Sequence, residues 1–312
     1  MRHKKTRLEG RWVLITGAGH GLGRALAGAM ADAGCRIIVT DQDPDRVDST
    51  TRWLSRRGNP AVGIEMDVTS EQSVAEARRL VNSRIGSIDV LVNNAGIVRG
   101  GSFTEVPLED HFTTLDVNTH GPIRVTHAFL PDLLASPIAH LVNIISASAL
   151  IGLPGASTYA ASKWALMGFS ESLREELRRA GHAHACVTAV CPSYISTGLF
   201  AGVRTPRFTR MLTPAAVARQ VVKAVLNRRP KLMLPRSVSL IPLSRALLPE
   251  SWSQRLGDWT GIHAGMADWH GHQHTQPDPL TRDPATPATP ATPATPAAVA
   301  ADSTHTAPVA GS

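Results

Sequence analysis

The sequence contains few cysteines and no long apolar run. Its three cysteines, Cys35, Cys186 and Cys191, are too few for a disulfide framework and include no C-x-x-C pair. This scarcity favours a reducing compartment, so we expect a cytoplasmic protein. No apolar run approaches the roughly 20 residues that a membrane-spanning helix requires. The basic start of the chain leads into a short apolar stretch and not into the longer apolar region of a signal peptide.

The net charge of +7 is unevenly distributed along the chain. Arg2, Lys4, Lys5 and Arg7 precede every acidic residue, so these positions account for more than half of the excess. We expect residues 1–10 to form a solvated basic arm, with weak contact to an anionic membrane surface as the alternative. No basic surface interleaved with aromatic residues is evident, so we expect no nucleic-acid partner.

The C-terminal part differs in composition from the rest of the chain. Residues 251–276 are rich in Trp and His, but no cysteine or carboxylate spacing completes a metal site among them, so we expect no bound metal. An Ala-Thr-Pro repeat follows, and proline at every third position prevents both helix and sheet. We therefore expect residues 277–312 to form a disordered tail.

Short apolar runs rich in β-branched residues alternate with helical stretches between residues 11 and 235. This alternation predicts a parallel sheet whose strands are buried on both faces. Right-handed crossovers then give a single doubly wound α/β domain of the Rossmann type, with about seven strands, helices on both faces and the ligand at the carboxyl ends of the strands. The predicted strands are Trp12–Thr16, Arg36–Thr40, Ala61–Met66, Ile88–Val92, His140–Ile145, Ala185–Val190 and Lys231–Leu234, and the predicted helices include Gly21–Ala33, Ser70–Arg84 with Ser70 as N-cap, and Ser157–Ala180.

A glycine-rich turn follows the first predicted strand. Its glycines at positions 17, 21 and 23 form the pattern G-x-x-x-G-x-G, which permits a tight turn and a close approach of the backbone to a pyrophosphate. The following helix would direct its N-terminus at the phosphates of a dinucleotide. The residues expected to bind the cofactor here are Thr16, Gly17, Gly19, His20, Gly21, Leu22 and Gly23.

A carboxylate stands at the end of the second predicted strand. Asp41 follows Gly23 by 18 residues, where an acidic side chain bonds the adenosine ribose hydroxyls of a dinucleotide. It would repel the additional phosphate of NADP, and the next residues, Gln42 and Asp43, supply no positive charge. We therefore expect NAD as the cofactor, with NADP as the alternative.

The order of the motifs resembles that of the short-chain dehydrogenase/reductase family. The glycine turn, Asp-Val at 67–68, Asn-Asn-Ala-Gly at 93–96 and Tyr-Ala-Ala-Ser-Lys at 159–163 follow in the family order, and the resemblance covers roughly residues 8–250. A Pro-Ser pair stands at 192–193, where the family usually has Pro-Gly. The resemblance implies that Asp67 and Val68 flank the adenine, that Asn94, Ala95 and Gly96 line the cofactor pocket, that Pro192 and Ile195 pack near the nicotinamide, and that Thr197 bonds its carboxamide.

Two residues on one face of a predicted helix carry the expected chemistry. Tyr159 and Lys163 are four residues apart. A free tyrosine has a pKa of about 10, and a neighbouring ammonium and a positive nicotinamide would both lower it, so that the phenol can exchange a proton with a substrate hydroxyl. By resemblance, Ser146 bonds the substrate oxygen, with Ser148 as the alternative. Asn118 likewise kinks its helix and holds a water in a proton relay with Lys163.

The region after Thr197 resembles one subgroup of the family, the retinol and 17β-hydroxysteroid dehydrogenases. Residues 197–212 would form a substrate lid, and Ser237–Pro249 would cap the pocket or lie against a membrane. We expect an NAD-dependent oxidoreductase that interconverts an alcohol and a carbonyl on a lipophilic steroid, retinoid or long-chain alcohol. The alternatives are an NADP-linked carbonyl reductase and a non-catalytic NAD-binding sensor, and the complete set of Ser146, Tyr159 and Lys163 argues against the sensor.

The resemblance also implies a homodimer or homotetramer. Its interfaces would be formed by the helices at Gly121–Ala135 and Ser157–Ala180. Trp164, Leu166 and Phe169 make the second helix apolar on more than one side, as expected of a helix that is buried on both sides.

Overall fold

The computed structural model describes residues 7–207, 210–262, 264–266 and 268–271. Within these ranges, seven strands form one sheet with only parallel neighbours, in the order β3-β2-β1-β4-β5-β6-β7. This confirms the predicted fold class and all seven predicted strands, whose ends differ from the prediction by at most two residues. The strands are β1 (Trp12–Ile15), β2 (Arg36–Asp41), β3 (Ala61–Glu65), β4 (Val90–Asn93), β5 (His140–Ile144), β6 (Cys186–Pro192) and β7 (Lys231–Leu234).

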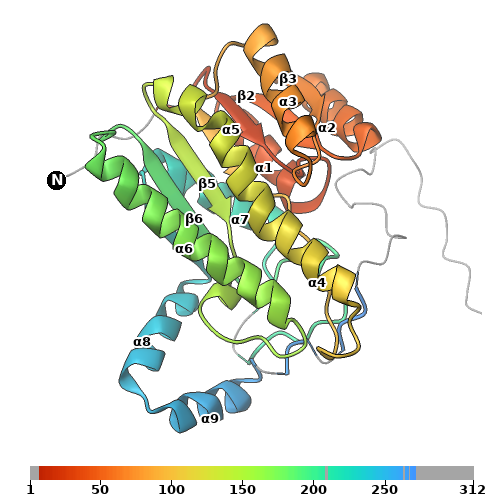
Figure 1. Cartoon of the computed structure of the whole chain (residues 1–312), viewed down its shortest axis with the longest axis vertical. Helices are drawn as coiled ribbons and strands as arrows, with labels where there is room; N and C mark the ends of the chain where they lie inside the picture. The colour runs from red at the N-terminus through yellow and green to blue at the C-terminus, as the bar shows by residue number, and fades with distance from the viewer. Residues whose placement is uncertain (1–6, 208–209, 263, 267, 272–312) are drawn as a thin grey trace, which may run out of the picture. The chain divides into compact units, whose positions relative to one another are not determined.

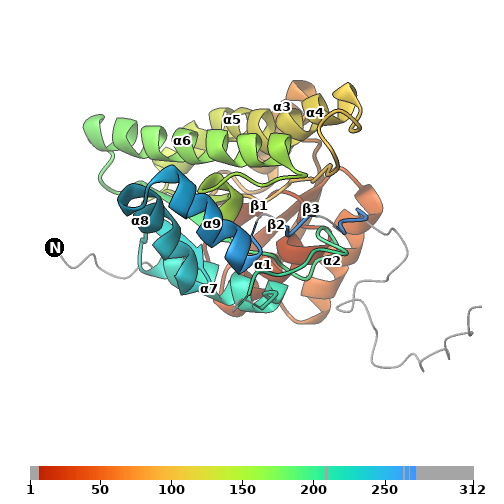
Figure 2. The same ribbon diagram turned by 90° about the horizontal axis from the view of Figure 1, so that it is seen from below.

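Helices cover both faces of the sheet (Figure 2). Successive residues of β1 face two different cores, because Val13 packs in the same cluster as Leu26, whereas Leu14 packs with Phe129. A strand covered in this way has no polar face, which explains its continuous apolar sequence. One layer contains α1 (Gly21–Asp32), α2 (Pro44–Arg56) and α7 (Pro214–Leu226), and the other contains α3 (Glu71–Arg84), α5 (Gly121–Ala135) and α6 (Ser157–Arg179).

Side-chain caps fix where several of these helices begin. The hydroxyl of Ser70 accepts a hydrogen bond from the N–H of Ser73 at 3.2 Å, which confirms the predicted N-cap of α3. Asp43 caps α2, and Thr213 caps α7. These polar residues end the preceding loops and fix where each helix begins, beside the carboxyl ends of the strands.

The order of the strands reverses between β1 and β4. From β1 the chain moves outward to β2 and β3, and it then returns to β4 and continues outward on the other side. The carboxyl ends of strands at such a switch point diverge and leave a crevice for a ligand. Shorter elements surround this edge: α4 (Leu108–Leu115), η1 (Asp116–His120), η2 (Ala147–Ala149), η3 (Arg236–Ser239), α8 (Leu240–Leu247) and α9 (Glu250–Thr260).

The helices α8 and α9 project from the rest of the domain as a hairpin (Figure 1). Helix α9 occupies part of the Trp- and His-rich extension. In the described ranges, no three His, Cys, Asp or Glu side chains converge as in a metal site, and no helix combines the length and apolar character needed to cross a membrane. The predicted Ala-Thr-Pro tail, most of the basic arm and several of the histidines lie outside the described residues.

Candidate active site

A cavity of about 120 Å³ lies at the carboxyl ends of the central strands. It brings together residues from the glycine turn, from the loops after β4, β5 and β6, and from α6. Segments far apart in the sequence thus meet at the edge where the topology places a ligand. The predicted site residues that line the cavity are Gly17, His20, Gly21, Leu22, Gly23, Asn94, Ala95, Gly96, Ser146, Tyr159, Lys163, Pro192, Ile195 and Thr197.

Two glycines of the turn occupy positions that favour glycine. Gly17 has a φ of +62°, which favours glycine. A Cβ atom added at Gly23 would lie 2.0 Å from the carbonyl oxygen of Gly17 and 2.6 Å from Nδ2 of Asn94. Thr16 does not line the cavity but holds this turn against the end of β4, because its hydroxyl accepts hydrogen bonds from the N–H groups of Asn94 and Ala95, each at 2.9 Å.

Asp41 lies beside the glycine turn with its carboxylate held in place. Its Oδ2 accepts a hydrogen bond from the N–H of Gly19 at 3.1 Å, and Nδ1 of His20 lies 3.8 Å from the same oxygen. Burial opposes the negative charge, but hydrogen bonds from His20, Asp43 and Gly19 outweigh it and lower the pKa of Asp41 below its usual value. The side chain is therefore a carboxylate at neutral pH, at the end of β2.

Asp67 and Val68 lie outside the wall of this cavity. The Oδ1 atom of Asp67 accepts hydrogen bonds from the N–H and the hydroxyl of Thr69, at 2.9 and 2.8 Å, and so closes the turn that follows β3. Val68 is buried, and a Cβ atom added at Gly121 would lie 2.9 Å from its Cγ2. Both residues stabilise local structure at the sheet edge, and contact with an adenine remains a prediction.

Asn118 lies in a π-helical turn between α4 and α5, which is the kink expected at this residue. Its Oδ1 accepts from the N–H of Ile97 and its Nδ2 donates to the Ile97 carbonyl oxygen, both at 2.9 Å. A Cβ atom added at Gly96 would lie 3.1 Å from Oδ1 of Asn118 and 3.5 Å from Nζ of Lys163. The two predicted relay residues therefore flank the same small space, and the water between them remains a prediction.

Tyr159, Lys163 and Ser146 meet between β5 and α6. Nζ of Lys163 donates to the carbonyl oxygen of Ile144 at 3.2 Å and lies 5.7 Å from the centre of the Tyr159 ring. The Ser146 side chain lies close enough to the Tyr159 hydroxyl to lower its pKa, and it accepts a hydrogen bond from the N–H of Ser148 at 3.1 Å. Ser148 lines only the neighbouring, outer cavity, so Ser146 is the serine that the fold brings to the phenol.

Burial dominates the ionisation of this group. It raises the pKa of Tyr159 to about 12, against a smaller opposing effect of the hydrogen bond with Ser146. Burial also lowers the pKa of Lys163 to about 8. Among the protein's own groups, desolvation of the phenolate is the largest effect on this pKa. The expected fall depends on a bound nicotinamide as well as on Lys163, so it stays a prediction.

The family model for short chain dehydrogenases matches residues 11–207. The chain belongs to the short-chain dehydrogenase family. This confirms the predicted membership, and with it an oxidoreductase that acts on CH–OH donors with a nicotinamide dinucleotide cofactor.

Similar proteins confirm the predicted subgroup. Epidermal retinol dehydrogenase 2 of Mus musculus is 33% identical over 258 residues, which cover 82% of this chain and 84% of the relative. Estradiol 17-beta-dehydrogenase 11 of Mus musculus is 28% identical over 253 residues, with 81% and 85% covered. A crystal structure of a short chain dehydrogenase/reductase from Burkholderia phymatum in complex with NAD has a TM-score of 0.71 and 26% identity, and covers 77% of this chain and 95% of that one.

The residues of this short-chain dehydrogenase fit a dinucleotide. Added Cβ atoms at Gly19 and Gly23 would lie only 2.5 and 2.0 Å from neighbouring atoms, so these positions need glycine, and their backbone lies at the N-terminus of α1, where a pyrophosphate can bind. The fixed carboxylate of Asp41 stands one strand away, where a ribose would lie. Tyr159 and Lys163 line the same cavity as the glycine turn.

A second, outer cavity of about 250 Å³ adjoins the first. Ser146 and Tyr159 line both cavities, so the hydroxyl groups lie where the two meet. The outer cavity is mainly apolar, and Phe200 packs edge-on against the rings of both Tyr159 and Tyr194, with centroid distances of 5.9 and 5.3 Å. Ser237, Val238 and Ile241, from the segment predicted as a cap, line this cavity. Tyr194, Thr260 and Ile262 also line it, and the sequence did not indicate these three residues.

The burial of Lys163 should reduce stability, and removing its charge should restore it. We expect Lys163→Met to raise the free energy of unfolding at pH 7. Burying the charged lysine lowers its pKa from 10.5 to about 8, which corresponds to a cost of about 3 kcal/mol in the folded state. The variant avoids this cost but loses the hydrogen bond to the carbonyl oxygen of Ile144. Folding depresses this pKa, so the native state binds fewer protons between pH 8 and 10.5, and the wild type regains stability across that window. Urea unfolding of both proteins should show a smaller difference between their free energies of unfolding at pH 10 than at pH 7. A variant less stable than the wild type at pH 7 would contradict this account.

The apolar residues of α6 mostly face the protein's own core. Leu166 is buried and Phe169 is partly buried against neighbouring clusters, whereas Trp164 is 45% exposed. Leu166 completes the packing of α6 against the sheet, so the helix is apolar on more than one side, as predicted, and its burial against a partner stays a prediction. Trp164 remains as an exposed apolar side chain of this helix.

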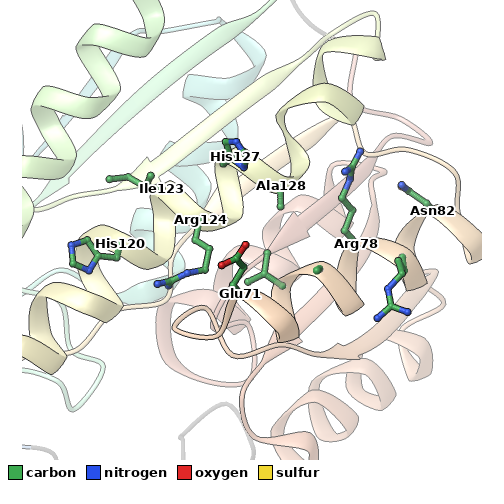
Figure 3. Close-up of a pocket in the computed structure, with 11 residues that line it drawn as sticks. Glu71, Arg78, Asn82, His120, Ile123, Arg124, His127 and Ala128 are labelled. Carbon is green, nitrogen blue, oxygen red and sulfur yellow. The ribbon is translucent and has the colours of Figure 1, made fainter.

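A hollow of about 670 Å³ lies between α3 and α5, on the outer side of the helical layer (Figure 3). Its labelled wall residues include three charged side chains, and two of these are already hydrogen-bonded. Arg78 donates to Asp132 at 2.7 Å, and Arg124 donates to the carbonyl oxygen of Val68 at 2.7 Å. These bonds tie α3 and the end of β3 to α5, so we regard this hollow as a structural groove between two helices.

Proposed function

We propose that this short-chain dehydrogenase uses NAD to interconvert an alcohol and a carbonyl on a lipophilic substrate, with Tyr159 as the acid/base residue. The observation that carries the proposal is the junction of the two cavities at Ser146 and Tyr159. One cavity is framed by the glycine turn, and the other is mainly apolar. The names of the similar retinol and estradiol dehydrogenases support a substrate of the retinoid, steroid or long-chain alcohol class.

The proposed roles follow from the positions of the side chains. When bound, the nicotinamide supplies the acceptor or donor of hydride. As a phenolate, Tyr159 takes the proton of the substrate hydroxyl during oxidation, and as a neutral phenol it returns that proton during reduction. Ser146, which lines the same two cavities as Tyr159, orients the substrate oxygen toward the phenol. The ammonium of Lys163 stabilises the phenolate, and Asn118 fixes the loop at Ile97 beside it.

The proposal also covers the compartment and the oligomeric state of the enzyme. Its three cysteines are free thiols, which supports a cytoplasmic protein. We place the chain in a homodimer or homotetramer, as is general in the family. A screen of purified protein against steroids, retinoids and long-chain alcohols with NAD⁺ and NADP⁺ tests the activity. No reduced cofactor with any alcohol would favour the alternative of a sensor that binds NAD without catalysis.

Asp41 should determine the choice of cofactor. Its carboxylate, fixed by Gly19 and of lowered pKa, accepts hydrogen bonds from ribose hydroxyls and repels a phosphate on that ribose. We expect NAD to bind more tightly than NADP, and Asp41→Ala to reduce the ratio of the two Kd values about tenfold. Fluorescence titration of both proteins with both cofactors measures this ratio. Asp32→Ala is a control with the same change of charge on the exposed end of α1, and a wild type that binds NADP as tightly as NAD would refute the assignment.

A further inference from the structure

One charged residue lines the outer cavity. Among the described residues of its wall, Arg207 is the only one with a formal charge at neutral pH, and the others are apolar or bear hydroxyl groups. Arg207 does not line the cavity of the glycine turn. Its charge therefore serves the cavity that would hold the substrate and not the one that would hold the dinucleotide. A negatively charged group in the outer cavity would meet this attraction, and no acidic residue of the described wall would repel it.

The outer cavity has two distinguishable ends. At one end, Ser146 and Tyr159 also line the cavity of the glycine turn. At the other end, Thr260 and Ile262 also line a third cavity, of about 260 Å³, beside α8 and α9. In the described part of the chain, the glycine-turn cavity and the third cavity share no wall residue. The N–H of Arg207 donates to the carbonyl oxygen of Thr260 at 2.8 Å, so Arg207 lies at the end remote from the reacting hydroxyls.

The acidic residues around this end leave Arg207 unpaired. Arg204, three residues earlier, forms an ion pair with Asp268. The guanidinium of Arg207 makes no hydrogen bond or ion pair with any described residue, and its side chain is exposed. Of the acidic residues of α9, Glu250 lines the third cavity and not the outer one, and Asp258 lines neither. A ligand in the outer cavity would therefore find this charge available.

We propose that the substrate is a lipophilic alcohol with a carboxylate at the end remote from its hydroxyl, and that Arg207 binds this carboxylate. The inference deepens the proposed function and rests on it for the reaction. The mainly apolar wall covers the chain between the two polar ends of such a molecule. The planar guanidinium can donate to both oxygens of a carboxylate. Because Arg207 is exposed, the bound carboxylate stays in contact with water and avoids the full cost of burial.

Pairs of substrates that differ only in charge test the proposal. Each ω-hydroxy fatty acid of a series of chain lengths is compared with its methyl ester, which keeps the chain and removes the charge. With the wild type and NAD⁺, we expect kcat/KM for the acid to exceed that for the ester about tenfold at the chain length that reaches from Tyr159 to Arg207. Arg207→Met keeps an unbranched side chain without the charge, so the ratio should fall to about one.

A charge reversal and a matched control sharpen this test. Arg207→Glu should favour an ω-amino alcohol over the ω-hydroxy acid of the same length, the opposite of the wild type, which loss of local structure alone would not produce. Arg210→Met removes the same charge three residues further along the chain, at an exposed position that does not line the outer cavity. This control should keep the wild-type ratio of acid to ester. Equal falls of the ratio in Arg207→Met and Arg210→Met would indicate a general effect of net charge and overturn the inference.

Binding measurements separate this inference from the proposed function. Calorimetric titration of the acids and esters into the same proteins with NAD⁺ present gives the ratio of Kd values without turnover, and we expect about tenfold tighter binding of the acid by the wild type. Acid and ester that bind and react equally at every chain length would refute this inference alone. Tighter binding of the acid through Arg207, without oxidation of any alcohol, would refute the proposed function alone.

Discussion

Replacing Tyr159 with Phe should lower kcat by about 10²–10⁴-fold, the usual contribution of general acid–base catalysis, without loss of folding or cofactor binding. The change removes only the hydroxyl. The ring keeps its edge-on contact with Phe200 and its position beside Lys163. Tyr159 is buried, and the phenylalanine ring fills the same space without leaving a new polar group unsatisfied. The temperature of thermal unfolding should therefore change little.

The only other tyrosine of the chain provides a matched control. Tyr194 also lines the outer cavity and also contacts Phe200, but it does not line the cavity of the glycine turn. Tyr194→Phe makes the same chemical change a short distance away, so kcat should fall far less. Steady-state rates with a saturating alcohol and NAD⁺, together with an NAD titration of each protein, measure the difference. Equal losses in the two variants would contradict the assignment of proton transfer to Tyr159.

Adding one methyl group at Gly23 should abolish tight binding of the cofactor. The new Cβ atom would lie 2.0 Å from a backbone oxygen of Gly17 and 2.6 Å from Asn94, and neither can move without opening the turn. Overpacking of this kind costs about 1–3 kcal/mol, which corresponds to a Kd for NAD raised about 5- to 150-fold if the turn yields. Equilibrium titration with NAD measures the change, and thermal unfolding shows whether α1 stays in place.

Gly168→Ala is the control for this substitution. Gly168 lies in α6, is exposed, and has no atom within 4 Å of the position of an added Cβ. Alanine in a helix is more favourable than glycine by about 1 kcal/mol, so this variant should be slightly more stable and should bind NAD normally. Wild-type binding by Gly23→Ala would show that the glycine turn does not hold the cofactor.

The fold was predictable because its determinants are local and repeated. Each strand, such as Val90–Asn93, is a short apolar run between helical segments, and burial on both faces leaves few alternatives to a parallel sheet. Caps such as Ser70 are visible as polar residues before a helix. The helices α8 and α9 were not predicted, because the apolar residues of that region indicate burial, whereas several of them are exposed.

The cofactor side of the site was also predictable, because its residues occur in short motifs. The substrate side was not, because Leu153, Tyr194, Val238 and Ile262 come from separate segments that only the fold brings together. The ionisation of Tyr159 was predictable only in part, for a related reason. Spacing on a helix shows that Lys163 is near, but it does not show how far burial removes the phenol from water.

The central claim is that NAD-dependent oxidation occurs at the junction between a dinucleotide cavity and an apolar cavity. The most direct measurement is kcat/KM with NAD⁺ for a series of alcohols of increasing chain length, followed by the absorbance of reduced cofactor. Each methylene buried contributes about 0.8 kcal/mol, so kcat/KM should rise about fourfold per carbon until the outer cavity of about 250 Å³ is filled. A series in which kcat/KM is independent of chain length, or falls with it, would contradict the account.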